Sequence, residues 1–495
     1  MGTYSNYIDH FRQLDLAFFP LDNPEVIFCP DTLQIFSARG RAGALLQELR
    51  CTPAVEAFLH QHAGDLPAIC GLIKRIIDSV GPESPALPQA FPEIAHGEHL
   101  PKLVLIVNNY CNLKCVYCYE HDTMFRWPAH SMTPELAEFT VEKFYTTFGS
   151  LGKLMFIGGE PTLNTGVIEA ACARALTLAE TLNVAPPAFS MISNGYKLDD
   201  STLALLDRYR IQTTFSIDGP KKVNDLVRIS GSGEGSYDRI ASNIRRFRAK
   251  VNAVPGVECT ITKVHQDTGI TIGDLLGFVA EEIGVQAPHI APAGVPAHSS
   301  LYPYGGDRQA LLREYREAAA ISVDNALARV TGSNDRACPA LDSVMSMLST
   351  LIKRKGTNGM CPAGTTQLSV DCHGDVYPCW MFAGVAEYRM GNVRADDIFN
   401  EMAVSVLKKI ALNTKQANAQ CSKCFARYLC NACVGNNHNT TGRFDQMDEG
   451  FCDVVRATAE TVIVKTAQLH DDPERWERLR GLAKSVRHSK AEACL

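Results

Sequence analysis

The sequence predicts an α/β protein, in which a parallel β-sheet with helices outside it lies between a compact N-terminal module and a cysteine-rich C-terminal region. Three observations indicate this. Apolar strands and helical segments alternate from about residue 101 to residue 283. A proline-rich stretch, VGPESPALPQAFPEI, precedes that pattern, and cysteines crowd the last third of the chain. We therefore expect three principal units, which agrees with the length of 495 residues.

The composition is that of a protein with a sizeable core, because 46% of the residues are hydrophobic and 21% are charged. The net charge of -6 provides no basic field, so we expect neither a nucleic-acid partner nor a membrane partner. The first residues lack the order of a signal peptide, and no run of eighteen apolar residues occurs. We expect a cytoplasmic protein whose 18 cysteines are reduced, with the clustered ones binding metal and the isolated ones having no role.

Residues 1–98 are predicted to form a winged-helix-like module followed by an extended linker. Two short apolar runs, at 26–28 and 33–36, are separated by a Pro-Asp turn signal and predict a β-hairpin. Helical segments follow, and Thr52 is the expected N-cap of one of them.

Residues 99–300 are predicted to form the parallel sheet, as a barrel or as an open doubly wound sheet. Its strands are KLVLIV, KLMFIG, AFSMIS, QTTFSID and VECTITKV, and each is followed by a helical segment. Ligands of such sheets gather at the carboxyl ends of the strands. After the sheet we expect a helical bridge at 301–355, a cysteine-rich domain at 356–460 and a C-terminal helix or tail at 461–495.

The first cysteine motif lies directly after the first apolar strand. The stretch LVLIVNNYCNLKCVYCYE places Cys111, Cys115 and Cys118 at C-x3-C-x2-C spacing. Three thiolates from one loop leave one iron of a four-iron cube without a protein ligand, so that iron can bind a substrate. A structural zinc site needs four ligands, and this loop holds neither a histidine nor a fourth cysteine.

This spacing, with Tyr117 before the last cysteine, resembles the signature of the radical S-adenosylmethionine (radical SAM) superfamily. The resemblance implies a partial (β/α)6 barrel and a [4Fe-4S] cluster whose open iron is chelated by S-adenosylmethionine (SAM). It also implies reductive cleavage of SAM to a 5′-deoxyadenosyl radical that abstracts hydrogen. An external electron donor such as flavodoxin or ferredoxin is then expected.

Polar residues and glycines at other strand ends agree with this resemblance. Gly158 and Gly159 are expected to let a ligand approach the backbone, and Glu160 to offer its carboxylate to an ammonium group. Without the cysteine motif, the same glycines are equally typical of a tight turn. The SAM-binding residues that the resemblance implies are Tyr117, Gly158, Gly159, Glu160, Pro161, Ser193, Asn194, Ser216 and Arg228.

The C-terminal cysteines resemble the SPASM extension of radical SAM enzymes that modify peptides. The seven matching residues are Cys361, Cys379, Cys421, Cys424, Cys430, Cys433 and Cys452. The resemblance implies two auxiliary [4Fe-4S] clusters, with the first, second and sixth of these cysteines on one cluster and the other four on the second. Two residues separate Cys430 from Cys433 where the family usually has three, so Cys433 is the least secure ligand. Paired C-x2-C units also form zinc ribbons, which is the alternative here.

Two cubes need eight thiolates, and the motif supplies seven. Cys338 and Cys372 are the candidates for the eighth position. A hairpin turn at 372–375 would separate Cys372 from Cys379 by roughly 13 Å at the usual rise per strand residue. We therefore expect Cys338, or an open iron that a substrate atom can reach.

The N-terminal hairpin and helices resemble the precursor-recognition element of ribosomal peptide maturases, in which a leader peptide adds a strand to the hairpin edge. An inert cap is the alternative. Our leading hypothesis is a radical SAM/SPASM maturase that installs a carbon–carbon or thioether/ether crosslink on a ribosomally synthesised precursor peptide. The alternatives are an anaerobic sulfatase-maturing enzyme, which generates formylglycine, and a non-catalytic zinc- or cluster-binding peptide adaptor. The sequence assigns no catalytic acid or base.

Overall fold

The computed structural model describes residues 2–20, 25–38, 40–80, 99–331, 339–395, 397–470 and 472–481. Its strands are β1 (Ala17–Phe19), β2 (Val26–Cys29), β3 (Gln34–Ser37), β4 (His99–Ile106), β5 (Ser150–Ile157), β6 (Ala188–Ser193), β7 (Gln212–Ser216), β8 (Gly256–Ile261), β9 (His289–Pro292), β10 (Gln367–Val370), β11 (Asp375–Tyr377) and β12 (Gly391–Asn392).

Its α-helices are α1 (Gly2–Gln13), α2 (Ala42–Cys51), α3 (Val55–Gln61), α4 (Leu66–Val80), α5 (Pro134–Phe148), α6 (Thr165–Thr181), α7 (Asp200–Arg208), α8 (Lys221–Val227), α9 (Tyr237–Lys250), α10 (Lys263–Asp267), α11 (Ile272–Phe278), α12 (Arg308–Thr331), α13 (Asp342–Lys353), α14 (Glu401–Leu412), α15 (Val434–Thr441) and α16 (Glu449–His470). Short helical turns are η1 (Tyr119–Asp122), η2 (Met124–Arg126), η3 (Pro161–Leu163), η4 (Val279–Ile283), η5 (Trp380–Phe382) and η6 (Ala386–Tyr388).

The barrel sheet contains six parallel strands in the order β4 to β9, with helices between successive strands. The predicted parallel α/β sheet and its partial (β/α)6 form are therefore confirmed. Residues 103–106 of β4 are apolar and buried on both faces, as expected for a strand inside a parallel sheet with helices outside it. Local signals set the helix ends: Thr133 caps α5, and Gly149 ends it with a φ of 71°.

The cysteine-rich region continues the same sheet. Strand β10 pairs in parallel with β4, opposite the side that β5 occupies, and β11 and β12 extend the sheet in antiparallel order. The nine strands thus form one sheet in the described residues. This continuity fixes the C-terminal cysteines relative to the barrel.

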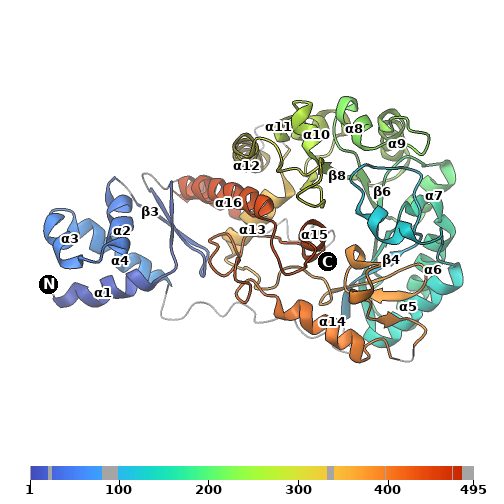
Figure 1. Ribbon diagram of the computed structural model, residues 1–495, viewed down its shortest axis with the longest axis horizontal. Helices are drawn as coiled ribbons and strands as arrows, with labels where there is room; N and C mark the ends of the chain where they lie inside the picture. Colours follow the sequence, from blue (N-terminus) through green and yellow to red (C-terminus); the bar gives the residue numbers. More distant parts are fainter. Residues whose placement is uncertain are drawn as a thin grey trace.

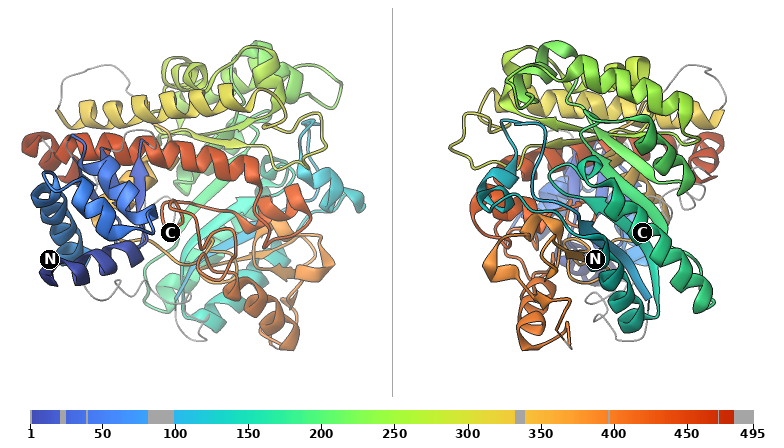
Figure 2. Two further views of the ribbon diagram at one scale, coloured as in Figure 1. Left: turned by 60° about the vertical axis from the view of Figure 1, so that its left-hand side comes forward. Right: turned by 90° about the vertical axis from the view of Figure 1, so that its right-hand side faces the viewer.

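Helix α16 connects the three parts of the molecule. It lies beside α12 along much of its length, as the left view of Figure 2 shows, and it also contacts α13, β2 and β3. In Figure 1 it runs from the N-terminal module toward the barrel. The helix passes through residue 460, where the sequence predicted a boundary.

The N-terminal module is a three-stranded antiparallel ribbon, β1-β2-β3, with α1 to α4 packed on one face. The predicted hairpin is present as β2 and β3. Side chains alternate along β2: Ile27 and Cys29 join the core of the module, whereas Val26 and Phe28 join the main core of the protein. Both faces of the ribbon are thus buried, and the module is fixed to the rest of the chain.

The prediction for Thr52 was wrong. Helix α2 continues to Cys51, and the Thr52 N–H donates to Glu48 O, so Thr52 ends α2. Helix α3 begins at Val55, and Ala54 is its N-cap residue. None of the described helices is both long and apolar enough to cross a bilayer.

Candidate functional site

The first cysteine loop follows β4, at the edge of the sheet where the parallel strands end. The segment after α8 holds this loop in place. Lys114 N donates to Ile229 O at 2.7 Å, and Val116 N donates to Val227 O at 3.0 Å. These bonds tie the loop to the end of α8 and the residues just after it, in the connection that follows β7.

The thiols of Cys111, Cys115 and Cys118 lie close enough to interact electrostatically. Burial raises the pKa of Cys111 to about 12 and also raises the pKa of Cys115 and Cys118. The Cys115 thiol raises the pKa of the other two further. Cys111 Sγ accepts hydrogen bonds from Leu113 N at 3.4 Å and from Asn194 Nδ2 at 3.3 Å.

This donor set fits an iron–sulfur cluster. The three cysteines are free thiols, and Cys111 receives the N–H donors that tune such clusters. Across the described ranges, no three His, Cys, Asp or Glu side chains converge on a position for a single metal ion. A cube differs from a single ion because each cysteine ligates a different iron. A bound metal deprotonates its thiol ligands and so offsets the effect of burial on their pKa.

Gly158 and Gly159 allow two strand ends to approach each other. A Cβ on Gly158 would lie 2.6 Å from Asn108 Oδ1, and one on Gly159 would lie 2.2 Å from Tyr110 O. The backbone explains this closeness, since Gly159 N donates to Asn108 O and Glu160 N to Tyr110 O, both at 3.1 Å. The predicted approach of a ligand to these glycines stays a prediction; in the structure they admit the backbone that leads into the cysteine loop.

The Glu160 carboxylate is fully buried and accepts four hydrogen bonds from the protein. Oε1 accepts from Thr162 N, Thr162 Oγ1 and Ser193 Oγ, and Oε2 accepts from Asn194 N at 2.7 Å. The sequence analysis predicted that this carboxylate binds an ammonium group, which stays a prediction; in the structure it also joins the ends of β5 and β6. Burial raises the pKa of Glu160, and these hydrogen bonds act in the opposite direction.

Half-buried Tyr117 of the cysteine loop forms a polar cluster with the buried side chains of Asp218 and Arg228. Tyr117 OH donates to Asp218 Oδ2 at 2.5 Å, and Arg228 Nη1 donates to Tyr117 OH at 2.6 Å. Arg228 Nη1 also lies 3.7 Å from Asp218 Oδ2. Burial works against the charge of Arg228, but Cys115, Tyr117 and Asp218 together raise its pKa well above the usual value.

Two more of the predicted SAM-binding residues lie at the same edge. Pro161 begins η3 and is buried, and Ser216 ends β7 and is half-buried. Asp218 was missed by the sequence analysis, although it stands in the quoted strand end QTTFSID. Asn112 was also missed, and its Oδ1 accepts from Asn194 Nδ2 at 2.8 Å. Only its place inside the cysteine loop could have indicated Asn112.

The C-terminal cysteines fall into two groups in the structure. We call Cys361, Cys379 and Cys433 the first auxiliary set. Burial raises the pKa of Cys361 to about 11 and raises the pKa of Cys379 by a larger amount. The nearby Cys433 thiol adds to both increases. Cys433 is the N-cap of α15, where its Sγ accepts from Asn436 N at 3.4 Å. The short spacing before Cys433 thus leaves it beside its predicted partners.

The second auxiliary set consists of Cys421, Cys424, Cys430 and Cys452. Burial raises the pKa of Cys421 to about 12 and that of Cys430 to about 11, and the Cys424 thiol raises both. Cys452 lies in α16, and its pKa is raised by burial and then by Cys430. The structure therefore brings together the same two groups that the resemblance implied.

Cys372 lies apart from both auxiliary sets. It is buried in the β10–β11 turn, and burial followed by Asp371 raises its pKa, to about 12, with no other cysteine contributing. The other candidate for the eighth ligand, Cys338, lies outside the described residues.

Comparison with known proteins agrees with this geometry. Residues 105–279 match the family model of the radical SAM superfamily, and residues 361–425 match that of SPASM, an iron–sulfur cluster-binding domain. Residues 105–279 thus form a radical SAM domain, and residues 361–425 belong to a SPASM domain. The protein is an enzyme that uses SAM radical chemistry, so the hypothesis of a non-catalytic adaptor is set aside. Its cofactors are SAM and iron–sulfur clusters, in the radical SAM barrel and in the SPASM domain.

Individual relatives are distant. A cysteine-type anaerobic sulfatase-maturating enzyme of Clostridium novyi (strain NT) is 22% identical over 388 residues, which are 74% of this chain and 96% of the relative. The radical SAM cyclopropyl synthase TigE of Paramaledivibacter caminithermalis is 24% identical over 174 residues, 32% of this chain and 35% of the relative. This chain is also similar to a solved structure, native anSMEcpe with bound AdoMet and Cp18Cys peptide, with a TM-score of 0.58 and 21% sequence identity. The match covers 74% of this chain and 99% of the solved chain.

Proposed function

We propose that this radical SAM/SPASM enzyme installs a carbon–carbon or thioether/ether crosslink on a ribosomally synthesised precursor peptide. The observation that carries the proposal is the ribbon module, which is fixed directly to the loop of the second auxiliary set. A module in that position can hold one part of a peptide while another part enters the barrel. The bound cofactors would supply a 5′-deoxyadenosyl radical that abstracts hydrogen from a peptide side chain.

Arg427 makes the contact between the module and the cysteine loop. Its side chain is 4% exposed and lies between Cys424 and Cys430 in the sequence. Nη2 donates to Asp15 Oδ2 at 2.6 Å and to Asp31 Oδ1 at 2.5 Å, and both aspartates belong to the module. These charge-assisted bonds are of the stronger class, so they hold the module in one orientation.

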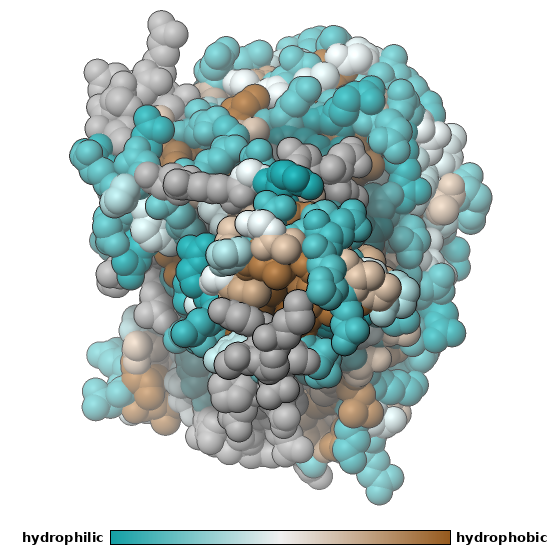
Figure 3. Space-filling view, turned by 90° about the vertical axis from the view of Figure 1, so that its left-hand side faces the viewer, coloured by the Kyte–Doolittle hydropathy of each residue, from teal (hydrophilic) through white to brown (hydrophobic). Residues whose placement is uncertain are grey.

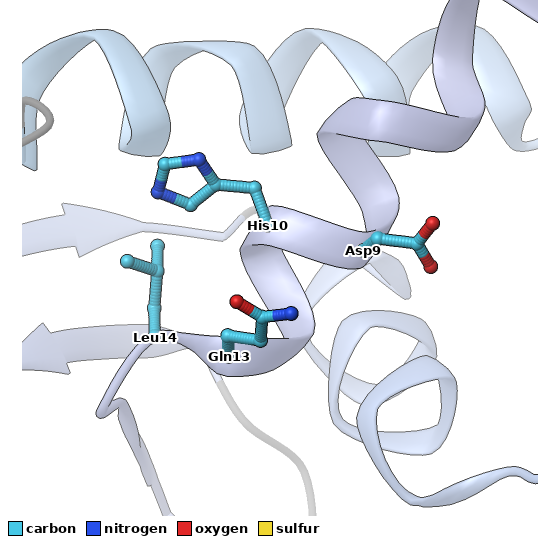
Figure 4. A pocket seen from close by; sticks show the side chains of 4 residues that line it. All are labelled: Asp9, His10, Gln13 and Leu14. Carbon is cyan, nitrogen blue, oxygen red and sulfur yellow. The ribbon is translucent and has the colours of Figure 1, made fainter.

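The module also offers a place for a peptide. A pocket of about 470 Å³ is lined by Asp9, His10, Gln13 and Leu14 of α1 and the residues just after it. Figure 4 shows His10 and Leu14 pointing toward the same space near the ribbon, whereas Asp9 points away from it. On this side of the molecule, apolar side chains gather near the middle of the face with polar ones around them (Figure 3). We propose that the leader of the precursor binds here, by strand addition to the ribbon.

In the barrel, we propose that Cys111, Cys115 and Cys118 ligate the cluster to which SAM binds. The close approach at Gly158 and Gly159 would fix the loop, and the N–H groups of Leu113 and Asn194 would stabilise the thiolate of Cys111. The polar cluster of Tyr117, Asp218 and Arg228 would keep water out and orient the adjoining strand ends. The remaining predicted SAM contacts, Pro161, Ser193 and Ser216, stay proposals of the same kind.

In the SPASM domain, we propose two auxiliary [4Fe-4S] clusters, one on each auxiliary set. The second set has four thiols for one cube, and the first set has three, which leaves one iron for Cys338 or for a substrate atom. Reductive cleavage of SAM needs one electron from outside. We therefore include an external donor such as flavodoxin or ferredoxin, acting in the cytoplasm.

A second candidate function is the oxidation of a sulfatase cysteine or serine to formylglycine. The relative from Clostridium novyi favours it, since that relative aligns over 96% of its own length. The N-terminal module favours the crosslinking function instead. Both functions place a peptide side chain at the barrel mouth.

Co-expression with a short precursor from a neighbouring reading frame distinguishes the two functions. A mass loss of two hydrogens per crosslink, with a linkage located by tandem mass spectrometry, supports the first. An aldehyde on a sulfatase-derived peptide, with the precursor unchanged, overturns it and supports the second. A full-length variant in which the cysteines of the first motif are replaced by alanine is the control, and we expect neither product from it.

A further inference from the structure

Lys415 is a buried cation that joins the two auxiliary sets. The residue follows α14 and is 2% exposed. Its backbone belongs to the segment beside the first set: Lys415 N donates to Asn358 O at 2.7 Å, and Thr414 pairs with Gly359 in a β-bridge. Its side chain reaches the second set, where Nζ donates to Cys430 O at 2.8 Å.

The position of Lys415 is held by its neighbours. Asn358 and Gln416 exchange two hydrogen bonds, one from Gln416 N to Asn358 Oδ1 at 3.0 Å and one from Asn358 Nδ2 to Gln416 Oε1 at 3.2 Å. Gln416 Nε2 also donates to Tyr428 OH at 2.9 Å. The segment is therefore anchored on both sides, and the ammonium group is kept away from solvent.

No carboxylate forms an ion pair with Lys415 in the part of the chain that the structure describes. An ammonium group taken out of water without a countercharge costs several kcal/mol. The groups that act on it electrostatically are the thiols of Cys430, Cys421 and Cys361, which belong to both auxiliary sets. As iron ligands these thiols are thiolates, so the clusters supply the missing negative charge.

We propose that Lys415 is the shared countercharge of the two auxiliary clusters and that it raises the reduction potential of both. Each cluster gains one negative charge when it takes up an electron, and a fixed cation nearby stabilises that reduced form. The proposal rests on the auxiliary clusters of the proposed function, but it does not depend on which peptide is modified.

Two substitutions separate the charge of Lys415 from its hydrogen bond. Lys415→Gln keeps an N–H donor but is neutral, and Lys415→Arg keeps the charge. The measurement is a redox titration of anaerobically reconstituted full-length enzyme, followed by electron paramagnetic resonance of the auxiliary clusters. For Lys415→Gln we expect about a tenfold smaller equilibrium constant for reduction, about 59 mV lower for a one-electron couple. A unit charge has an effect of this size at about 12 Å in a medium of effective dielectric constant about 20.

Lys415→Arg should stay within about threefold of the wild-type equilibrium constant. The matched control is Lys409→Gln, because Lys409 is an exposed lysine of α14 that pairs with Glu387, and no shift is expected. If Lys415→Gln loses the auxiliary iron while Lys415→Arg retains it, the charge is again the required feature, and the proposal is supported.

Unchanged potentials in Lys415→Gln overturn the proposal, as does a Lys415→Arg variant that behaves like the neutral one. Loss of auxiliary iron from both variants also overturns it, because the size and shape of the Lys415 side chain would then matter rather than its charge. A wild-type protein with zinc in place of the auxiliary clusters would instead refute the proposed function, so the two failures are distinguishable.

Discussion

Replacing Arg427 by methionine should release the N-terminal module from the cysteine loop. The substitution keeps most of the side-chain volume but removes three hydrogen bonds, to Asp15, Asp31 and Cys424 O. Breaking a fully buried ion pair costs about 3–5 kcal/mol. Because Asp15 and Asp31 are 49% and 30% exposed, water can solvate them, and we reduce the expected loss of docking free energy to about 2–3 kcal/mol.

Hydrogen exchange followed by mass spectrometry measures this loss directly. A cost of about 2–3 kcal/mol corresponds to about a 30- to 160-fold faster exchange of the β1 and β2 amides that are protected only while the module is docked. Amides of α4, inside the separate core of the module, should exchange at the wild-type rate. Arg443→Met is the control, because Arg443 is 67% exposed and pairs with half-buried Asp445. Equal exchange in Arg427→Met and Arg443→Met would refute the reasoning.

Three further predictions concern the site and the sheet. Replacing Cys111, Cys115 and Cys118 together by alanine should abolish SAM cleavage and leave about eight of about twelve irons; cleavage that persists in a product assay contradicts the assignment. Gly159→Ala should lose iron from the same loop, because its Cβ would lie 2.2 Å from Tyr110 O, whereas Gly166→Ala, where no atom lies within 4 Å, should retain it on metal analysis. Asp371→Asn should remove a pH dependence: burial raises the pKa of Asp371 to about 6, so the folded state binds the proton more tightly, and wild-type stability should fall by up to about 3 kcal/mol from pH 4 to pH 7. Thermal melting should show that fall in the wild type and not in the variant; equal slopes would contradict it.

The barrel could be predicted from the sequence because its signals are local. Apolar strands such as β6 are followed within a few residues by a capped helix, here α7 with Asp199 as its N-cap, and the cysteine spacing places three thiols on one loop whatever surrounds it. The grouping of the C-terminal cysteines came from a resemblance, and the structure brings the same groups together. The contacts of Cys433 depend on α15, which begins at the next residue.

Long-range contacts could not be predicted in this way. Arg427 and Asp15 are 412 residues apart in the sequence, and neither residue differs in type from an ordinary surface residue. The role of Gly159 also depended on a distant strand, because what it accommodates is the backbone of Tyr110. Lys415 gave no signal at all, since a lysine after a helix is normally solvated. Burial and charge at such positions are properties of the folded chain.

Mössbauer spectroscopy of anaerobically reconstituted ⁵⁷Fe protein, with and without SAM, tests the central claim most directly. The account predicts about twelve irons per chain in cubane clusters, with SAM changing the signal of a single iron site and leaving the rest unchanged. Stoichiometric zinc in the protein, or spectra that SAM does not alter, would contradict it.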